Sequence, residues 1–109
     1  MPDNFVIDGW LVAETTIPES WPQANVRRGG CLLLFRGEQG WTLLTLRQLT
    51  TWRDQEPVDG LTTGSVRVYP SLAAVQARLA GTSLWEPLLH AGAERNAELR
   101  ALWEGLDGR

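Results

Sequence analysis

The spacing of hydrophobic and polar positions changes once along this chain, near residue 70. Residues 5 to about 69 contain apolar runs with strand-like spacing between turn-forming residues, whereas residues 71 to about 106 have apolar positions at helical spacing. A run of strands followed by a run of helices is typical of an α+β domain with an antiparallel sheet. The sequence therefore predicts an α+β fold in which two C-terminal helices pack on a sheet of about four strands.

The clearest strand prediction is a central hairpin. Apolar runs at residues 31–36 and 41–49 are joined by Gly37-Glu38-Gln39-Gly40, a four-residue link with glycine at both ends. Both runs place apolar residues on both faces of the predicted sheet, which favours a central position.

Two outer strands are predicted at residues 5–13 and 65–69, where β-branched and aromatic residues dominate or alternate with polar ones. Residues 18–30 contain two prolines and the pair Gly29-Gly30, and they are predicted to form a loop. Residues 50–64 are predicted to form a long irregular connection, which in a compact domain is usually functional or mobile.

The helices are predicted at residues 72–80 and 84–104. Ser71 is a suitable N-cap for the first, because its hydroxyl can accept from a free N–H of the first turn, and Gly81 is placed to follow its last residue. Residues 83–86 have the spacing of a capping box at the start of the second. Gly92 weakens that helix by about 1 kcal/mol relative to alanine.

Length and composition suggest one domain over residues 1–109 without membrane attachment. The first residues lack the basic and apolar regions of a signal peptide, and no apolar run approaches the roughly 20 residues that span a bilayer. We therefore expect a cytoplasmic protein with no membrane partner. All ten basic residues are arginine, which suggests a GC-rich bacterial genome. The strand-to-helix step at residues 67–75 resembles one found in many small plasmid- and phage-borne proteins, which suggests a mobile-element origin.

The single cysteine and single histidine limit the chemistry that the chain can perform. Cys31 lies in a strongly apolar run and is interpreted as a small core residue, and His90 is predicted to lie opposite the apolar stripe of its helix. The acidic residues at 54–59 are interpreted as a solvated loop, because their spacing does not fit a calcium loop. We therefore expect no catalytic residues, no metal site and no cofactor.

Six tryptophans are the most unusual feature of the composition. Trp10, Trp41 and Trp103 lie within periodic elements, where the interpretation is that they fill the core. The other three lie in predicted loops or at a helix start, where full burial is harder.

These observations favour a small non-enzymatic binding protein whose partner is another protein or a second copy of the chain. Tryptophan and arginine are enriched where proteins bind one another. One alternative is a nucleic-acid-binding regulator that uses the basic segment 27–53, with Trp41 or Trp52 as a stacking platform. Another is a small-molecule-binding protein with a tryptophan-lined pocket. The predicted contact residues are Trp21, Arg27, Arg28, Trp52, Arg53 and Trp85.

Overall fold

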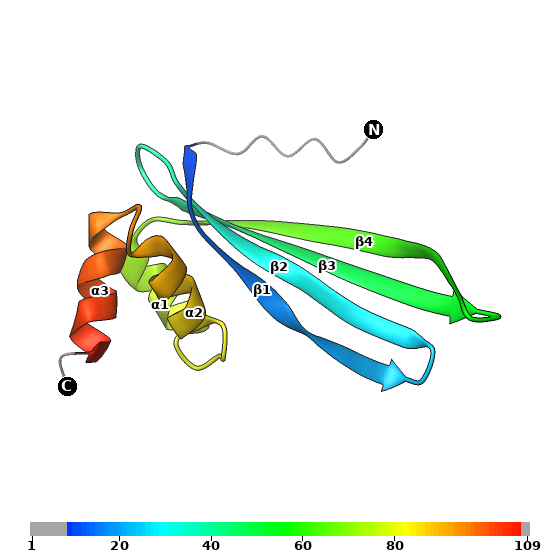
Figure 1. Ribbon diagram of the computed structural model, residues 1–109. Coiled ribbons are helices and arrows are strands. Elements are labelled where there is room, and N and C mark those ends of the chain that lie inside the picture. The colour runs from blue at the N-terminus through cyan, green and yellow to red at the C-terminus, as the bar shows by residue number, and fades with distance from the viewer. Residues whose placement is uncertain (1–8, 108–109) are drawn as a thin grey trace.

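In a computed structural model, four long strands and three short helices follow one another along residues 9–107 (Figure 1). The structure describes residues 9–107, except for the side chains of residues 59, 61 and 107. The predicted α+β fold, a sheet followed by C-terminal helices, is confirmed. The elements are β1 (Trp10–Gln23), β2 (Val26–Arg36), β3 (Trp41–Arg53), β4 (Glu56–Tyr69), α1 (Leu72–Leu79), α2 (Trp85–Gly92) and α3 (Ala97–Asp107).

The sheet is an antiparallel meander with the order β1-β2-β3-β4. Its central hairpin is the predicted one: Arg36 lies opposite Trp41, and the N–H of Gly37 donates to the carbonyl of Gly40 (2.8 Å) in the turn. The predicted central position of β2 and β3 is also confirmed, because β1 and β4 form the two edges.

The strands are much longer than predicted. Residues 18–30, predicted to be a loop, instead complete β1 and begin β2, and the two-residue turn Ala24-Asn25 joins them. The predicted long connection at residues 50–64 is also wrong, because β3 continues to Arg53 and β4 begins at Glu56. The first strand, predicted at residues 5–13, begins at Trp10 in the described part of the chain, and residues 5–8 lie outside it.

The turn between β3 and β4 explains why the sequence pattern hid this hairpin. Asp54 and Gln55 both have positive φ angles, 53° and 69°. Two positive φ angles in a two-residue loop match the twist of antiparallel strands and are usually supplied by Asn-Gly or Asp-Gly. Glutamine in the second position gives no such signal.

Three helices take the place of the two that were predicted. Ser71 caps α1 as expected, and its Oγ accepts from the N–H of Ala74 (3.2 Å). The predicted helix at residues 84–104 is interrupted after Gly92, and α3 begins only at Ala97. The capping box predicted at residues 83–86 does not form, because the N-cap of α2 is Leu84, which makes no side-chain capping hydrogen bond.

The break between α2 and α3 has a packing cause and a capping residue. A Cβ atom on Gly92 would meet side-chain atoms of Leu99 and Ala13, so Gly92 allows α2 to lie close to both α3 and β1. Asn96 then starts α3, and its Oδ1 accepts from the N–H of Leu99 (3.0 Å). Asparagine is among the strongest N-cap residues.

We expect Asn96→Ala to lower the free energy of unfolding by about 1 kcal/mol, because the N–H of Leu99 loses its acceptor. Asn96→Asp keeps a capping oxygen and should stay within about 0.5 kcal/mol of the unmodified protein. Urea denaturation of the two variants measures both values. Equal losses in the two variants would show that Asn96 does not act as a cap.

The core lies between the helices and one end of one sheet face, which we call the helix face. A bulge between Leu11 and Ala13 turns both Val12 and Ala13 toward the helices, and both are buried. The opposite side of the sheet is called the open face, because none of the three helices packs on it. The core side chains are Val12, Ala13, Leu32, Leu34, Trp41, Leu43, Leu72, Val75, Leu79, Trp85, Leu88, Leu89 and Leu99.

Two of the three tryptophans predicted to fill the core do so at least in part. Trp41 is buried, and Trp103 packs against the core while half-buried. Trp10 does not, because it lies at the start of an edge strand and is 58% exposed.

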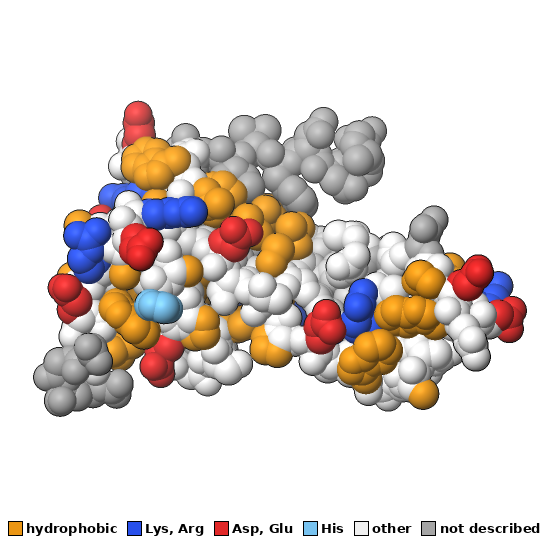
Figure 2. Space-filling model, in the orientation of Figure 1, with side chains coloured by type: hydrophobic (Ala, Val, Ile, Leu, Met, Phe, Trp, Pro, Cys, Tyr) orange, Lys and Arg blue, Asp and Glu red, His pale blue; other side chains and the backbone are white. Residues whose placement is uncertain are grey.

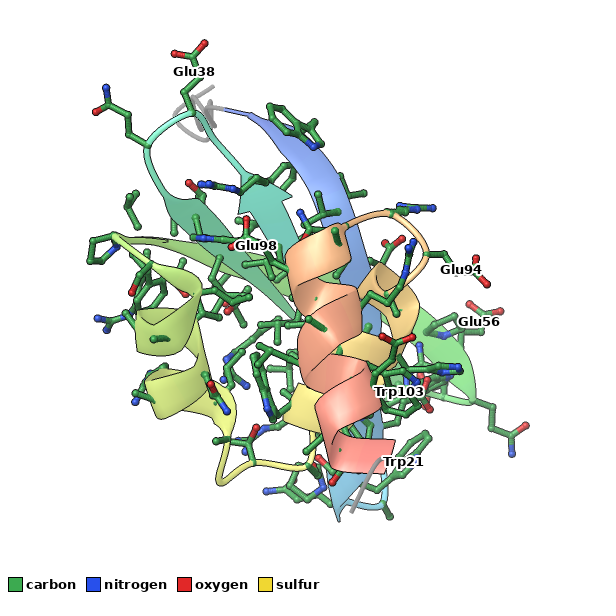
Figure 3. The ribbon with its side chains drawn as sticks, turned by 90° about the vertical axis from the view of Figure 1, so that its left-hand side faces the viewer. Trp21, Glu38, Glu56, Glu94, Glu98 and Trp103 are labelled. Atoms are coloured by element: carbon green, nitrogen blue, oxygen red, sulfur yellow. The ribbon has the colours of Figure 1, made fainter. Side chains whose placement is uncertain are left out.

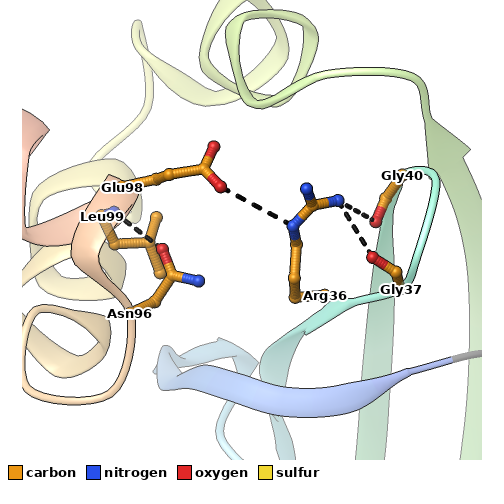
Figure 4. Close-up of polar contacts among 6 residues, drawn as sticks. All are labelled: Arg36, Gly37, Gly40, Asn96, Glu98 and Leu99. Carbon is orange, nitrogen blue, oxygen red and sulfur yellow. Dashed lines mark hydrogen bonds and ion pairs between the residues drawn. The ribbon is translucent and has the colours of Figure 1, made fainter.

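Arg36 joins the central hairpin to the last helix (Figure 4). Its Nη1 donates to the carbonyls of Gly37 and Gly40, both at 3.0 Å, and its Nε lies 3.7 Å from a carboxylate oxygen of Glu98 on α3. Its guanidinium carbon also lies 4.8 Å from the centre of the Trp41 ring. The guanidinium group of Arg36 therefore has its polar partners within the fold.

The helices cover only one end of the sheet, and the strands extend well beyond them (Figure 1). We call the extended part, residues 18–29 and 48–63, the arm. The radius of gyration is 16.0 Å, compared with about 13 Å for a compact domain of this length. The arm therefore exposes a large surface for a chain of this size.

Candidate functional site

The open face of the arm carries a cluster of two tryptophans, one arginine and one glutamate, which we call the tryptophan cluster. Trp21 comes from β1 and Trp52 from β3, and their rings stack with centroids 5.3 Å apart and planes inclined by 30°. Arg27, on β2 between them, places its guanidinium carbon 5.1 Å from the centre of the Trp52 ring. Its Nη1 lies 3.9 Å from Oε1 of Glu19.

Three neighbouring strands bring these residues together. The register of β1 shifts on both sides of Ser20, and the contacts of Glu19 with Arg27 and of Trp21 with Trp52 show that both residues face the open side of the sheet. The backbone N–H of Trp52 donates to the carbonyl of Asn25 (3.0 Å), which fixes the end of β3 beside the turn that precedes Arg27. The cluster is therefore positioned by strand pairing.

Trp21 is the more accessible of the two tryptophans in the cluster. It is 53% exposed, whereas Trp52 is half-buried beneath its neighbours. Figure 2 shows hydrophobic side chains gathered beside acidic and basic ones at the end of the arm. In the view along the strands, Trp21 lies at the outside of the molecule (Figure 3).

A hollow of about 440 Å³ lies beside the tryptophan cluster, and Glu19 and Arg27 form part of its wall. The absence of a side chain at Gly29 leaves space in its floor. A Cβ atom on Gly29 would have only the Cγ of Glu19 nearby, at 3.6 Å. The other wall residues are Thr16, Ile17, Gly30, Cys31, Leu46, Arg47, Gln48, Thr50 and Thr62.

Cys31 lines this hollow, but its surroundings do not favour the reactive thiolate form. Partial burial raises the pKa of its thiol above the ordinary value, and the negative charge of Glu14 raises it further. Because the thiolate is the nucleophile, a raised pKa opposes reactivity at neutral pH. His90, the other residue considered for such chemistry, is exposed on α2 and packs on Trp103, with ring centroids 4.8 Å apart.

Only three of the six predicted contact residues meet in the cluster: Trp21, Arg27 and Trp52. Arg28 and Arg53 are exposed, but they lie on the helix face of the arm, since each is adjacent in sequence to a residue of the open face. Trp85 is the first residue of α2 and is 4% exposed, so it belongs to the core. Burial removes Trp85 from the contact surface.

Two features of this site were missed by sequence reasoning. Glu19 and the hollow at Gly29 both fall in residues 18–30, which the pattern assigned to a loop. The two-residue spacing from Glu19 to Trp21, and from Arg27 to Gly29, was the available signal. It becomes informative only once these residues are recognised as strands.

The basic segment 27–53 does not form one surface. Arg27 lies on the open face, while Arg28, Arg47 and Arg53 lie on the helix face. Trp41 is buried in the core and offers no stacking surface. Within this segment, the half-buried ring of Trp52 therefore shares the open face with Arg27, while Arg28, Arg47 and Arg53 lie on the opposite face.

The hollow beside the tryptophan cluster has no tryptophan in its wall, and neither do two further hollows on the described part of the chain. Within residues 9–107 there is also no group of three His, Cys, Asp or Glu side chains that could hold a metal ion. No described helix is long and apolar enough to cross a membrane.

Comparisons with protein-family models, with curated proteins and with solved structures gave no match for this chain. Its function is therefore inferred from its own residues.

Proposed function

We propose that this protein is an interaction module that binds a second copy of itself through the open face of its sheet. The observation that carries the proposal is the exposed Trp21, stacked on Trp52 directly beside a hollow on the same face. Tryptophan is among the residue types most enriched at the positions that dominate the binding energy of protein interfaces. The Trp21–Trp52 stack restricts the Trp21 ring before binding and so lowers the entropic cost of contact.

A projecting side chain and a hollow on one face suit a symmetric dimer. In a two-fold interface the same surface patch is used by both copies, so it must complement itself. Trp21 of one copy can enter the hollow of the other, and the reverse contact forms at the same time. The hollow, at about 440 Å³, has room for a large side chain.

The charges beside the hollow are also self-complementary. Glu19 and Arg27 flank it as one acid and one base, at an Nη1–Oε1 distance of 3.9 Å. In a two-fold arrangement, each of them can face the opposite charge on the partner copy. Exchange of these pairs across the interface would cost little, because the contact within one copy is long and partly exposed.

The size of the open face fits such a dimer. Its four strands, 11 to 14 residues long, have a plan area of roughly 700–900 Å² at the usual strand spacing and rise per residue. Thr42 and Leu44 on this face are already buried in a single copy, so a dimer would use chiefly the arm. Stable interfaces bury about 800 Å² on each partner. Two sheets packing through these faces would also supply the second layer that the arm lacks.

We expect the protein to dimerise at micromolar concentration, and Trp21→Ala to weaken the dimer roughly tenfold or more. Trp10→Ala is a matched control: Trp10 is similarly exposed, at 58%, and lies outside the tryptophan cluster. Sedimentation equilibrium over a concentration series measures the dissociation constant of each protein.

Two results would count against the proposal. One is an unmodified protein that stays monomeric up to about 200 μM, far above the dissociation constants of specific dimers. The other is a Trp10→Ala variant that weakens association as much as Trp21→Ala does, because the interface would then lie elsewhere.

A further inference from the structure

A second hollow, of about 300 Å³, lies on the helix face, where α1 and the connection to α2 meet the sheet. This hollow, which we call the cleft, is separate from the tryptophan cluster because it opens on the other side of the sheet. Its walls include Thr45 and Arg47 of β3, Ser65 and Arg67 of β4, and Arg78 of α1.

The cleft is strongly basic. Three arginines, Arg47, Arg67 and Arg78, contribute to its walls, and no described aspartate or glutamate does. Within residues 9–107 none of these three arginines forms an ion pair, whereas Arg27 and Arg36 each have a carboxylate partner. Uncompensated guanidinium groups around one hollow attract an anion, and their planar geometry suits phosphate in particular.

Strand register places hydroxyl groups between two of these arginines. Thr45 lies directly opposite Ser65, and this pair is flanked by Arg67 opposite Leu43 on one side and by Arg47 opposite Thr63 on the other. Neither the Thr45 nor the Ser65 hydroxyl has a hydrogen bond to the rest of the described chain. Both can therefore donate to an oxygen bound between the guanidinium groups.

Tyr69 provides an independent sign of a polar ligand. It is another wall residue, and its hydroxyl oxygen is buried without a hydrogen-bond partner among the described residues. Buried hydroxyls nearly always have a partner, and leaving one unpaired is unfavourable. After a small movement of the ring, an anion in the cleft would accept this hydrogen bond.

The remaining wall is mostly apolar. Ile17, Leu32, Leu43, Leu79 and Leu84 contribute to it, and the hydroxyl of Thr82, its other member, is bonded to the backbone of Leu79 and Leu84. The volume is at the lower end of the range for small-molecule sites. A ligand that fills the cleft therefore has an anionic head and a compact apolar part.

From these observations we infer that the cleft binds a small phosphate monoester with an aromatic or aliphatic substituent. Its phosphate would lie between Arg47, Arg67 and Arg78, with the Thr45 and Ser65 hydroxyls as additional donors. A dianion suits three unpaired guanidinium groups better than a monoanionic carboxylate does.

The test is isothermal titration calorimetry with phenyl phosphate, inorganic phosphate and benzoate. We expect saturable 1:1 binding of phenyl phosphate, roughly tenfold tighter than benzoate because of the second charge. Inorganic phosphate should bind more weakly than phenyl phosphate, since it leaves the leucine wall unfilled. Equal affinities for phenyl phosphate and benzoate, or no binding of either, would overturn the inference.

Substitutions inside and outside the cleft show whether phenyl phosphate binds there. Arg67→Gln should weaken phenyl phosphate binding roughly tenfold, while Arg53→Gln, an equal charge change on the same face outside the cleft, should change it less than about twofold. Tyr69→Phe should weaken binding several-fold without lowering the melting temperature, because it removes a hydroxyl that has no hydrogen-bond partner within residues 9–107. Tyr69→Phe also keeps the test decisive if Arg67→Gln fails to fold.

A single-stranded oligonucleotide distinguishes a small ligand from a nucleic acid. Displacement of a weakly bound oligonucleotide by phenyl phosphate would support the cleft as the phosphate site. Tight oligonucleotide binding that Arg53→Gln and Arg67→Gln weaken equally, without competition from phenyl phosphate, would overturn it in favour of a nucleic-acid surface.

Discussion

Replacing Trp85 by alanine is expected to lower the free energy of unfolding by about 3–5 kcal/mol, the usual loss for truncating a buried tryptophan. Trp85 is 4% exposed and belongs to the core cluster between α2 and the sheet. Its removal would leave a cavity that the surrounding strands and helices cannot fill. Urea denaturation, followed by far-ultraviolet circular dichroism at low protein concentration, measures the loss.

The exposed tryptophans are the controls for this experiment. Trp10→Ala and Trp21→Ala should each cost less than about 1.5 kcal/mol in the monomer, with Trp21 at the upper end because of its ring stacking. A loss for Trp85→Ala as small as that for Trp10→Ala would contradict the placement of Trp85 in the core. If Trp85→Ala does not fold, Trp85→Phe still allows the stability loss at this position to be compared with the losses at Trp10 and Trp21, because phenylalanine retains most of the buried ring.

Gly30→Ala is expected to destabilise the protein by about 2–4 kcal/mol, for a backbone reason. Gly30 has a φ of 154°, which side-chain-bearing residues rarely adopt. A Cβ atom there would overlap the carbonyl oxygen of Leu46 on the neighbouring strand. The sheet would have to separate locally between β2 and β3 to accept the methyl group.

Gly29→Ala is the matched control, one residue earlier in the same strand. Its Cβ would meet only the Cγ of Glu19, at 3.6 Å, an ordinary contact. We expect a change within about 1 kcal/mol, in either direction, because alanine also restricts the unfolded chain. Thermal and urea unfolding of both variants measure the contrast. Similar losses at the two positions would show that steric overlap at Gly30 is not the cause.

The central hairpin and the first helix could be predicted because local signals agreed there. The residues from Cys31 to Arg47 combine two apolar runs with a glycine-bounded turn, and Ser71 caps α1 as its position suggests. Each of these features depends on a few neighbouring residues. Such features are recognisable without knowledge of the rest of the fold.

The outer strands were hidden by residues that normally exclude strands. Pro18 and Pro22 lie in β1 and Pro57 lies in β4. Proline cannot donate to a ladder, but an edge strand has donors that face away from the sheet, and β1 and β4 are the two edges. The prolines therefore mark edge strands here, although the sequence alone suggested loops.

The candidate site was predicted in part for the same reason. Residue type was enough to select Trp21, Arg27 and Trp52. It could not separate them from Arg28 and Arg53, because residues 18–30 and 50–64 were not recognised as strands and side-chain alternation could not be applied. Trp85 was misplaced because a helix start appeared to be exposed, whereas α2 begins directly on β1.

The meander order also bears on how the chain reaches this structure. Every strand pairs with the next one along the sequence, so each hairpin closes a short loop at low entropic cost. The packing of α2 on β1, where Gly92 meets Val12, instead joins the two ends of the domain. Topologies rich in contacts between sequence neighbours fold faster than those rich in distant ones. Much of the sheet can thus assemble from its turns, and helix docking is the step that brings distant parts of the chain together.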